Sequence, residues 1–112
     1  MKCLYGEALE KREVKRQMAA AEKIGELRLG EELLIHRYFF STKYIRRKDI
    51  TRVFVRVESG EYGEFPLHEH SLVVIDAGGR EHVLHIDHPN FGKETMEKLT
   101  AADSRIQTGK PE

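Results

Sequence analysis

The pattern of apolar and polar residues predicts a helix, a group of strands and a second helix, in that order. Residues 7–24 contain neither Gly nor Pro and carry apolar side chains at roughly helical spacing. This favours an amphipathic helix that ends at Gly25. Asn90 is suited to cap a second helix. Within that helix the apolar residues again recur at helical spacing, as Met96, Leu99, Ala102 and Ile106.

Between the two helices the pattern changes to that of β-strands. Residues 33–40 form an apolar and aromatic run, and residues 43–46 suit a second, shorter strand. Residues 52–57 alternate strictly, so that three valines share one face of the strand: Val53, Val55 and Val57. Residues 59–63 contain two glycines and are expected to form a loop. The segment therefore predicts about five or six strands.

The clearest local signal is a hairpin formed by residues 72–76 and 81–86. These strand-like segments flank Gly78 and Gly79, which adopt the positive φ of tight hairpin turns at little cost. A two-residue turn at these glycines sets the register. The pairs then expected to face the core are Ile75 with His82, Val73 with Leu84, and Ser71 with Ile86. The pairs expected on the opposite face are Leu72 with His85 and His70 with Asp87.

Composition indicates a single folded domain that spans residues 1–112. Of these residues, 39% are apolar and 34% are charged, which suits neither a disordered chain nor a membrane span. The formal net charge is 0. This argues against a generally basic nucleic-acid binder, and no signature of a nucleic-acid-binding fold is visible. We therefore expect no nucleic-acid partner.

The chain has one cysteine, Cys3, so no disulfide within the chain is expected. The first residues carry no apolar run typical of a signal peptide, and no stretch has the length of a membrane helix. These features favour a cytoplasmic protein without a membrane span.

Three short segments carry a resemblance to a known group of domains. They are residues 29–32 before the aromatic strand, residues 44–50 before the alternating strand, and residues 70–81 in the hairpin. On these segments the chain resembles the bacterial pleckstrin-homology-like (PH-like) families, most of which have no known function. The resemblance covers about residues 26–106.

The resemblance implies an α+β fold in which a strongly bent antiparallel sheet forms a roll or half-barrel with a C-terminal helix at its open end. The domain would then consist of an extra N-terminal helix in residues 1–25, the PH-like core in residues 26–106 and a frayed tail in residues 107–112. A small unrelated α+β roll is the alternative.

Histidine is the first candidate for binding chemistry. The chain has six histidines, five of them between positions 68 and 88. In the predicted register, four side chains share one strand face: His68, His70, His85 and Asp87. Three imidazoles and a carboxylate suit zinc, nickel or copper. The alternative is a solvated strand face on which histidines lie opposite acids.

Basic residues form the second candidate. Residues 37–56 contain seven Lys and Arg but only one acid, Asp49. In PH domains that bind phosphoinositides, basic residues on the early strands and their loop hold the phosphates. By this resemblance the candidates for an anionic lipid are Lys43, Arg46, Arg47 and Lys48. The alternative is a solvated pair of strands, because exposed charges are common.

No pattern of catalytic residues is evident. The chain has no Gly-rich phosphate loop and no Gly-x-Ser-x-Gly elbow, and Cys3 lies at a terminus. We therefore predict a non-enzymatic interaction module without a cofactor. Its expected partner is another protein or a second copy, bound through an exposed strand edge or the N-terminal helix. Metal binding and anionic-lipid binding are the alternatives.

Overall fold

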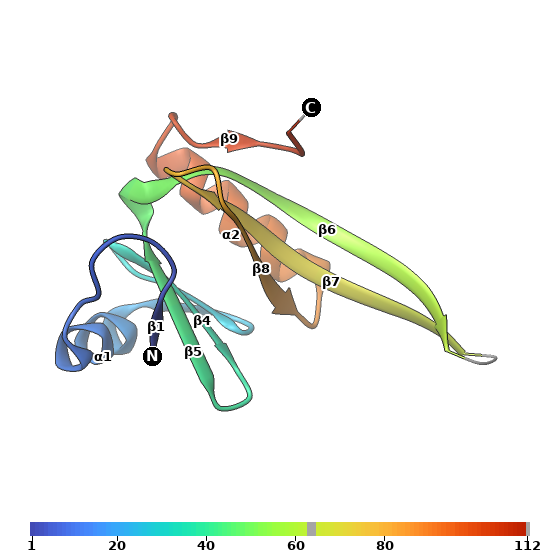
Figure 1. The fold of residues 1–112 in the computed structure, drawn as a ribbon, viewed down its shortest axis with the longest axis horizontal. Coiled ribbons are helices and arrows are strands. Elements are labelled where there is room, and N and C mark those ends of the chain that lie inside the picture. Colours follow the sequence, from blue (N-terminus) through green and yellow to red (C-terminus); the bar gives the residue numbers. More distant parts are fainter. Residues whose placement is uncertain (63–64, 112) are drawn as a thin grey trace.

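The chain folds into two β-sheets and two α-helices in a computed structural model, so the predicted α+β class is confirmed (Figure 1). The structure describes the backbone of residues 1–62 and 65–111, and the side chains of these residues outside 59–67. The first sheet has the order β1 (Lys2–Cys3), β5 (Ser41–Arg46), β4 (Leu33–Tyr38), β3 (Leu27–Leu29) and β2 (Glu22–Ile24). The second has the order β8 (Glu81–Ile86), β7 (Phe65–Asp76), β6 (Ile50–Tyr62) and β9 (Gln107–Thr108).

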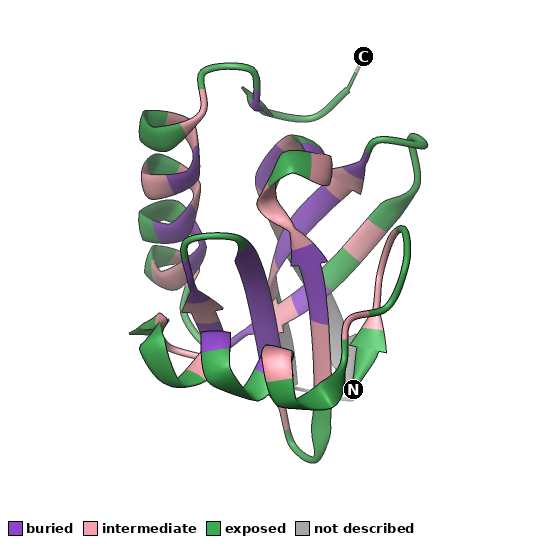
Figure 2. Ribbon diagram, turned by 90° about the vertical axis from the view of Figure 1, so that its left-hand side faces the viewer, coloured by how far each residue is buried: buried purple, intermediate pink, exposed green. Residues whose placement is uncertain are grey.

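The two helices cover different surfaces of these sheets. They are α1 (Lys11–Ala20) and α2 (Pro89–Ala102), and a short 3₁₀ turn at Arg47–Asp49 leads into β6. A large core forms where the inner faces of the two sheets meet α2 (Figure 2). Its buried members include Leu27, Leu34, Ile45, Val53, Leu72, Leu84, Ile86 and Leu99. The predicted C-terminal helix is therefore confirmed, but its N-cap is His88 instead of Asn90, and Ile106 lies beyond its end at Ala102.

The N-terminal helix lies on the other face of the first sheet. Val14 of α1 is fully buried against Leu33, Ile35 and Tyr44. Successive residues of β4 therefore face α1 and the main core alternately. Both faces of the strand are covered, which explains its apolar sequence. The backbone N–H of Leu9 also donates a hydrogen bond of 2.9 Å to the Tyr44 hydroxyl. The apolar side of α1 is occupied within the chain, so this helix acts as a lid.

The ends of the chain differ from the sequence prediction. The expected helix over residues 7–24 forms only at Lys11–Ala20, because Glu22–Ile24 pairs with β3 across a turn at Gly25. The expected frayed tail contains β9, which pairs with β6 at Arg52 and Val53. β1 pairs in parallel with β5, and β9 pairs in parallel with β6, so the prediction of a wholly antiparallel sheet is wrong. Parallel pairing needs a long crossover, and α1 and α2 lie within these connections.

The hairpin of β7 and β8 forms, but its predicted register is wrong by one residue. Leu72 lies opposite Leu84, and Ser71 lies opposite His85. The cause is the carboxylate of Asp76, whose Oδ1 accepts hydrogen bonds from the N–H groups of Gly78 and Arg80 at 2.8 and 3.0 Å. Burial alone would raise the pKa of Asp76, but the hydrogen bonds from His82 and these N–H groups outweigh it and lower the pKa. The turn thus begins at Asp76 instead of Ala77.

This shift exchanges the two faces of β7, whereas Leu84 and Ile86 of β8 face the core as predicted. The face with Leu72, Val74, Leu84 and Ile86 lies in the core. The face expected there, with Val73, Ile75 and Ser71, is the outer face of the second sheet. Among the described residues, no helix is both long enough and apolar enough to cross a membrane.

Candidate functional site

The tip of the β4–β5 hairpin exposes two aromatic side chains. Phe39 is 83% exposed and Phe40 is 107% exposed, although Phe is usually buried. Phe39 also has a φ of 54°, which is unfavourable for a bulky residue. The end of this hairpin, which belongs to the first sheet, extends beyond the neighbouring elements (Figure 1). The apolar run over residues 33–40 predicted a strand that includes both residues, whereas β4 ends at Tyr38 and both residues lie in the turn.

Positive charge surrounds this tip. The sequence has no Asp or Glu between residues 33 and 48. Arg37 lies opposite Thr42 near the end of the hairpin, and Lys43 lies opposite His36. On its other side Lys43 is paired with Lys2 of β1. Two exposed rings at the end of the hairpin therefore have three cations behind them: Arg37 and Lys43 of the hairpin and Lys2 of the neighbouring β1.

The four basic residues predicted to bind lipid do not form one group. Lys43 points to the inner face of the first sheet, and Arg46 lies on the α1 face, since β5 alternates between the two. Arg46 donates a hydrogen bond of 2.6 Å to the Glu7 carbonyl oxygen, and Arg47 donates one of 2.7 Å to that of Gly30. Arg46, Arg47 and Lys48 line a shallow pocket together with Glu31 and Glu32. Carboxylates thus offset the charge at that end, and only Lys43 belongs to the tip.

The predicted metal ligands are also divided. His70 pairs with Ile86 on the inner face of the second sheet, and His68 lies two residues away on that face. His85 pairs with Ser71 on the outer face because of the register shift. The structure thus separates His85 from His68 and His70 but keeps it beside Asp87, with their Nε2 and Oδ1 atoms 3.2 Å apart.

A seam between the two sheets contains His85 and Asp87. We use this name for the place where the β2–β3 turn and β4 meet the end of β8. Oε2 of Glu26 accepts a hydrogen bond of 3.0 Å from the backbone N–H of Asp87. The ring of Tyr38 lies 4.3 Å from the ring of His85, centroid to centroid. Glu26 has no neighbouring motif and lies far from His85 in the chain, so the sequence offered no signal for this contact.

Buried His36 joins β4 to β8 at the seam. It is 5% exposed, and its Nε2 lies 2.7 Å from the carbonyl oxygen of His85. Because a carbonyl only accepts, Nε2 carries the proton of this neutral ring. Burial, together with the charges of Lys43 and His85, lowers the pKa of His36 below its ordinary value of 6.5 and outweighs the hydrogen bond to His85. Above pH 6.5 the ring of His36 is therefore neutral and donates the inter-sheet hydrogen bond through Nε2–H.

Stability should fall below pH 6.5 because of His36. The unfolded chain takes up a proton on this residue near pH 6.5, whereas the folded chain resists it until a lower pH. The loss therefore begins near pH 6.5 and continues down to the folded-state pKa. We expect His36→Gln to reduce the stability difference between pH 7.5 and 5.5 by up to about 1 kcal/mol, as measured by urea unfolding. The exposed His88→Gln is the control, and an equal effect of both variants would contradict the assignment.

Comparison with known protein families, curated proteins and solved structures finds no match for this chain. The PH-like resemblance therefore remains a prediction from the residues that carry it. The candidate surfaces must be judged from their own geometry and charge.

Proposed function

We propose that this protein is a non-enzymatic interaction module that docks on anionic membrane surfaces through the tip of the β4–β5 hairpin. The observation that carries the proposal is the high exposure of Phe39 and Phe40 at the end of an acid-free hairpin. A convex tip of this kind inserts its rings among lipid chains more readily than it fits a flat protein surface. Lys2, Arg37 and Lys43 would remain at the level of the headgroups, where each cation near an anionic surface contributes about 1 kcal/mol.

The fold family and the cellular compartment are two further parts of the proposal. A PH-like half-barrel, the fold that the resemblance implies, is kept as part of the proposal because the C-terminal helix is present, although the two sheets, over their described residues, are neither closed nor strongly curled. Cys3 is a free cysteine, which supports the cytoplasm as the compartment. The membrane in question would then be a cytoplasmic leaflet, where anionic lipids are abundant.

Sedimentation with lipid vesicles tests this function. We expect the protein to pellet with vesicles that contain phosphatidylserine and to stay in solution with vesicles of phosphatidylcholine alone. Added salt should weaken the binding, because Lys2 and Arg37 are exposed and therefore screened, and Lys43 is partly exposed. Equal partition between the two kinds of vesicle, or no pelleting with either, would contradict the proposal and favour a protein partner for the tip.

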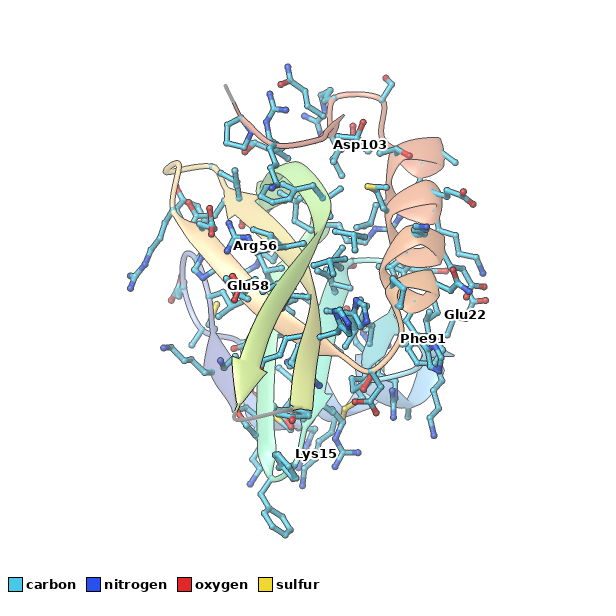
Figure 3. All side chains as sticks on the ribbon, turned by 90° about the vertical axis from the view of Figure 1, so that its right-hand side faces the viewer. Lys15, Glu22, Arg56, Glu58, Phe91 and Asp103 are labelled. Atoms are coloured by element: carbon cyan, nitrogen blue, oxygen red, sulfur yellow. The ribbon has the colours of Figure 1, made fainter. Side chains whose placement is uncertain are left out.

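A second candidate function is self-association along the edge of β6. This strand pairs with β9 only at Arg52 and Val53, and within the described part of the chain no other strand covers this edge. Val57 is 54% exposed there. Arg56 and Glu58 flank it and share one face of the strand (Figure 3).

The edge is complementary to itself in charge. Antiparallel pairing of two copies about a two-fold axis at Val57 would place Arg56 of each copy opposite Glu58 of the other. Arg56 donates a hydrogen bond of 2.7 Å to Glu81 within the chain. A guanidinium has five N–H donors, so it retains donors for a second carboxylate.

Val57→Lys should weaken this self-association at least about tenfold, because a charge on an edge strand opposes edge-to-edge pairing. Sedimentation equilibrium over a wide concentration range measures the effect. Val83→Lys is the matched control, since Val83 is 48% exposed on β8. A monomer at every concentration, or an equal effect of the control, would rule out the β6 edge.

A further inference from the structure

The seam holds three potential metal ligands from two sheets. Glu26 lies in the β2–β3 turn, His85 lies in β8, and Asp87 follows the end of β8. One ligand atom from each of these residues lies within 4.8 Å of the others. The set is one imidazole nitrogen and two carboxylate oxygens. These atoms are ligands for a borderline transition metal such as Zn²⁺.

One carboxylate oxygen in the seam has no hydrogen-bond partner in the described part of the chain. Oε1 of Glu26 is buried and accepts no hydrogen bond among the described residues, while Oε2 faces Asp87. The guanidinium of Arg28 is nearby, but it donates hydrogen bonds of 2.7 and 3.0 Å to the carbonyl oxygens of Gly25 and Leu27. A buried carboxylate oxygen without a partner is costly. A bound cation would remove that cost.

The ligands are held by the surrounding structure. The ring of His85 packs on Tyr38 at 4.3 Å between centroids, and its carbonyl oxygen lies 2.7 Å from Nε2 of His36. Asp87 is tied through its backbone N–H to Glu26. In a tetrahedral zinc site with bonds of about 2.0–2.2 Å, ligand atoms lie roughly 3.3 Å apart. The side chains of His85 and Asp87 are 32% and 71% exposed, which leaves them room to rotate toward that spacing.

We propose that Glu26, His85 and Asp87 bind one Zn²⁺ ion that joins the β2–β3 turn of the first sheet to the end of β8 in the second, with water completing the coordination. The ion replaces the direct contact between His85 and Asp87. It also neutralises the two carboxylates. None of the three ligands lies at the hairpin tip, so the proposal does not rest on membrane binding.

Calorimetric titration of tag-free protein with Zn²⁺ tests the site. We expect one ion per chain, and a higher melting temperature in the presence of zinc because the ion links the two sheets. Mg²⁺ should not compete, since it prefers oxygen ligands. Glu26→Gln and Asp87→Asn should each weaken zinc binding at least about tenfold. His85→Phe keeps the ring against Tyr38 and should abolish binding.

The other histidines supply the matched control. His68→Gln and His70→Gln should leave both the affinity and the zinc-dependent rise in melting temperature unchanged, since neither residue belongs to the cluster. Circular dichroism checks that each variant folds. The proposal is overturned if zinc does not bind, if His85→Phe binds as the wild type does, or if His70→Gln removes the binding.

Discussion

Replacing Phe39 and Phe40 together by serine should reduce binding to vesicles containing phosphatidylserine by roughly 100-fold. Moving a phenyl ring from water into an apolar environment is worth about 1.5–3 kcal/mol, so two rings contribute at least about 3 kcal/mol. A serine side chain contributes almost none of this transfer free energy. Both rings are exposed in the free protein, so the substitution removes no contact from the core.

The stability of this double variant should stay within about 0.5 kcal/mol of wild type or rise slightly, because serine replaces a bulky residue at the positive φ of Phe39. Loss of binding will therefore not reflect unfolding. Replacing the exposed valines, in Val57→Ser and Val83→Ser, controls for apolar area elsewhere. Lys48→Gln controls for charge away from the tip. If the double variant binds as tightly as wild type, the tip is not the membrane-binding surface.

Gly25→Ala should lower the free energy of unfolding by about 3 kcal/mol, the largest effect that we expect from a single methyl group. Gly25 has a φ of 60°, which costs an L-residue about 1–2 kcal/mol. An added Cβ would also lie 2.3 Å from Cδ2 of Phe91. Phe91 lies in the first turn of α2, where this helix packs on the β2–β3 turn (Figure 3). Relieving that overlap costs roughly another 1–3 kcal/mol. Thermal and urea unfolding measure the loss.

Two variants separate the backbone cost from the overlap. Gly79 has a φ of 85° with nothing within 4 Å of an added Cβ, so Gly79→Ala measures the backbone cost alone. Adding Phe91→Ala to Gly25→Ala removes the ring that the new methyl group would strike, so the double variant should lose less stability than the sum of the single variants. If Gly25→Ala is no worse than Gly79→Ala, then Phe91 does not pack on this turn as described.

The sequence predicted which segments form helices and strands better than it predicted which residues pair with each other. The valines at 53, 55 and 57 do alternate in β6, and the apolar spacing from Met96 to Leu99 marks α2, because these signals are local. The β7–β8 register failed by one residue, because the turn is set by the carboxylate of Asp76 and not by its glycines. That single shift moved His85 away from His68 and His70.

The candidate surfaces depended even more on contacts between distant residues. Glu26 meets Asp87 across 61 residues, and no periodicity reports such a contact. Phe39 and Phe40 looked like strand residues because aromatic side chains favour strands. Only the turn at Tyr38 showed that both rings are exposed. The basic segment was visible in the sequence, but its division between the hairpin tip and the pocket beside Glu31 was not.

The most direct test of the membrane-binding tip is the fluorescence of Phe40→Trp. The chain contains no tryptophan, so this substitution introduces a single reporter at the most exposed position of the hairpin. We predict that vesicles with phosphatidylserine shift its emission to shorter wavelength and that lipids with bromine in their chains quench it. Phosphatidylcholine vesicles should do neither, and a tryptophan in Val83→Trp should not respond. If the emission of Phe40→Trp stays that of a water-exposed indole while the protein is bound to vesicles, the tip does not enter the membrane.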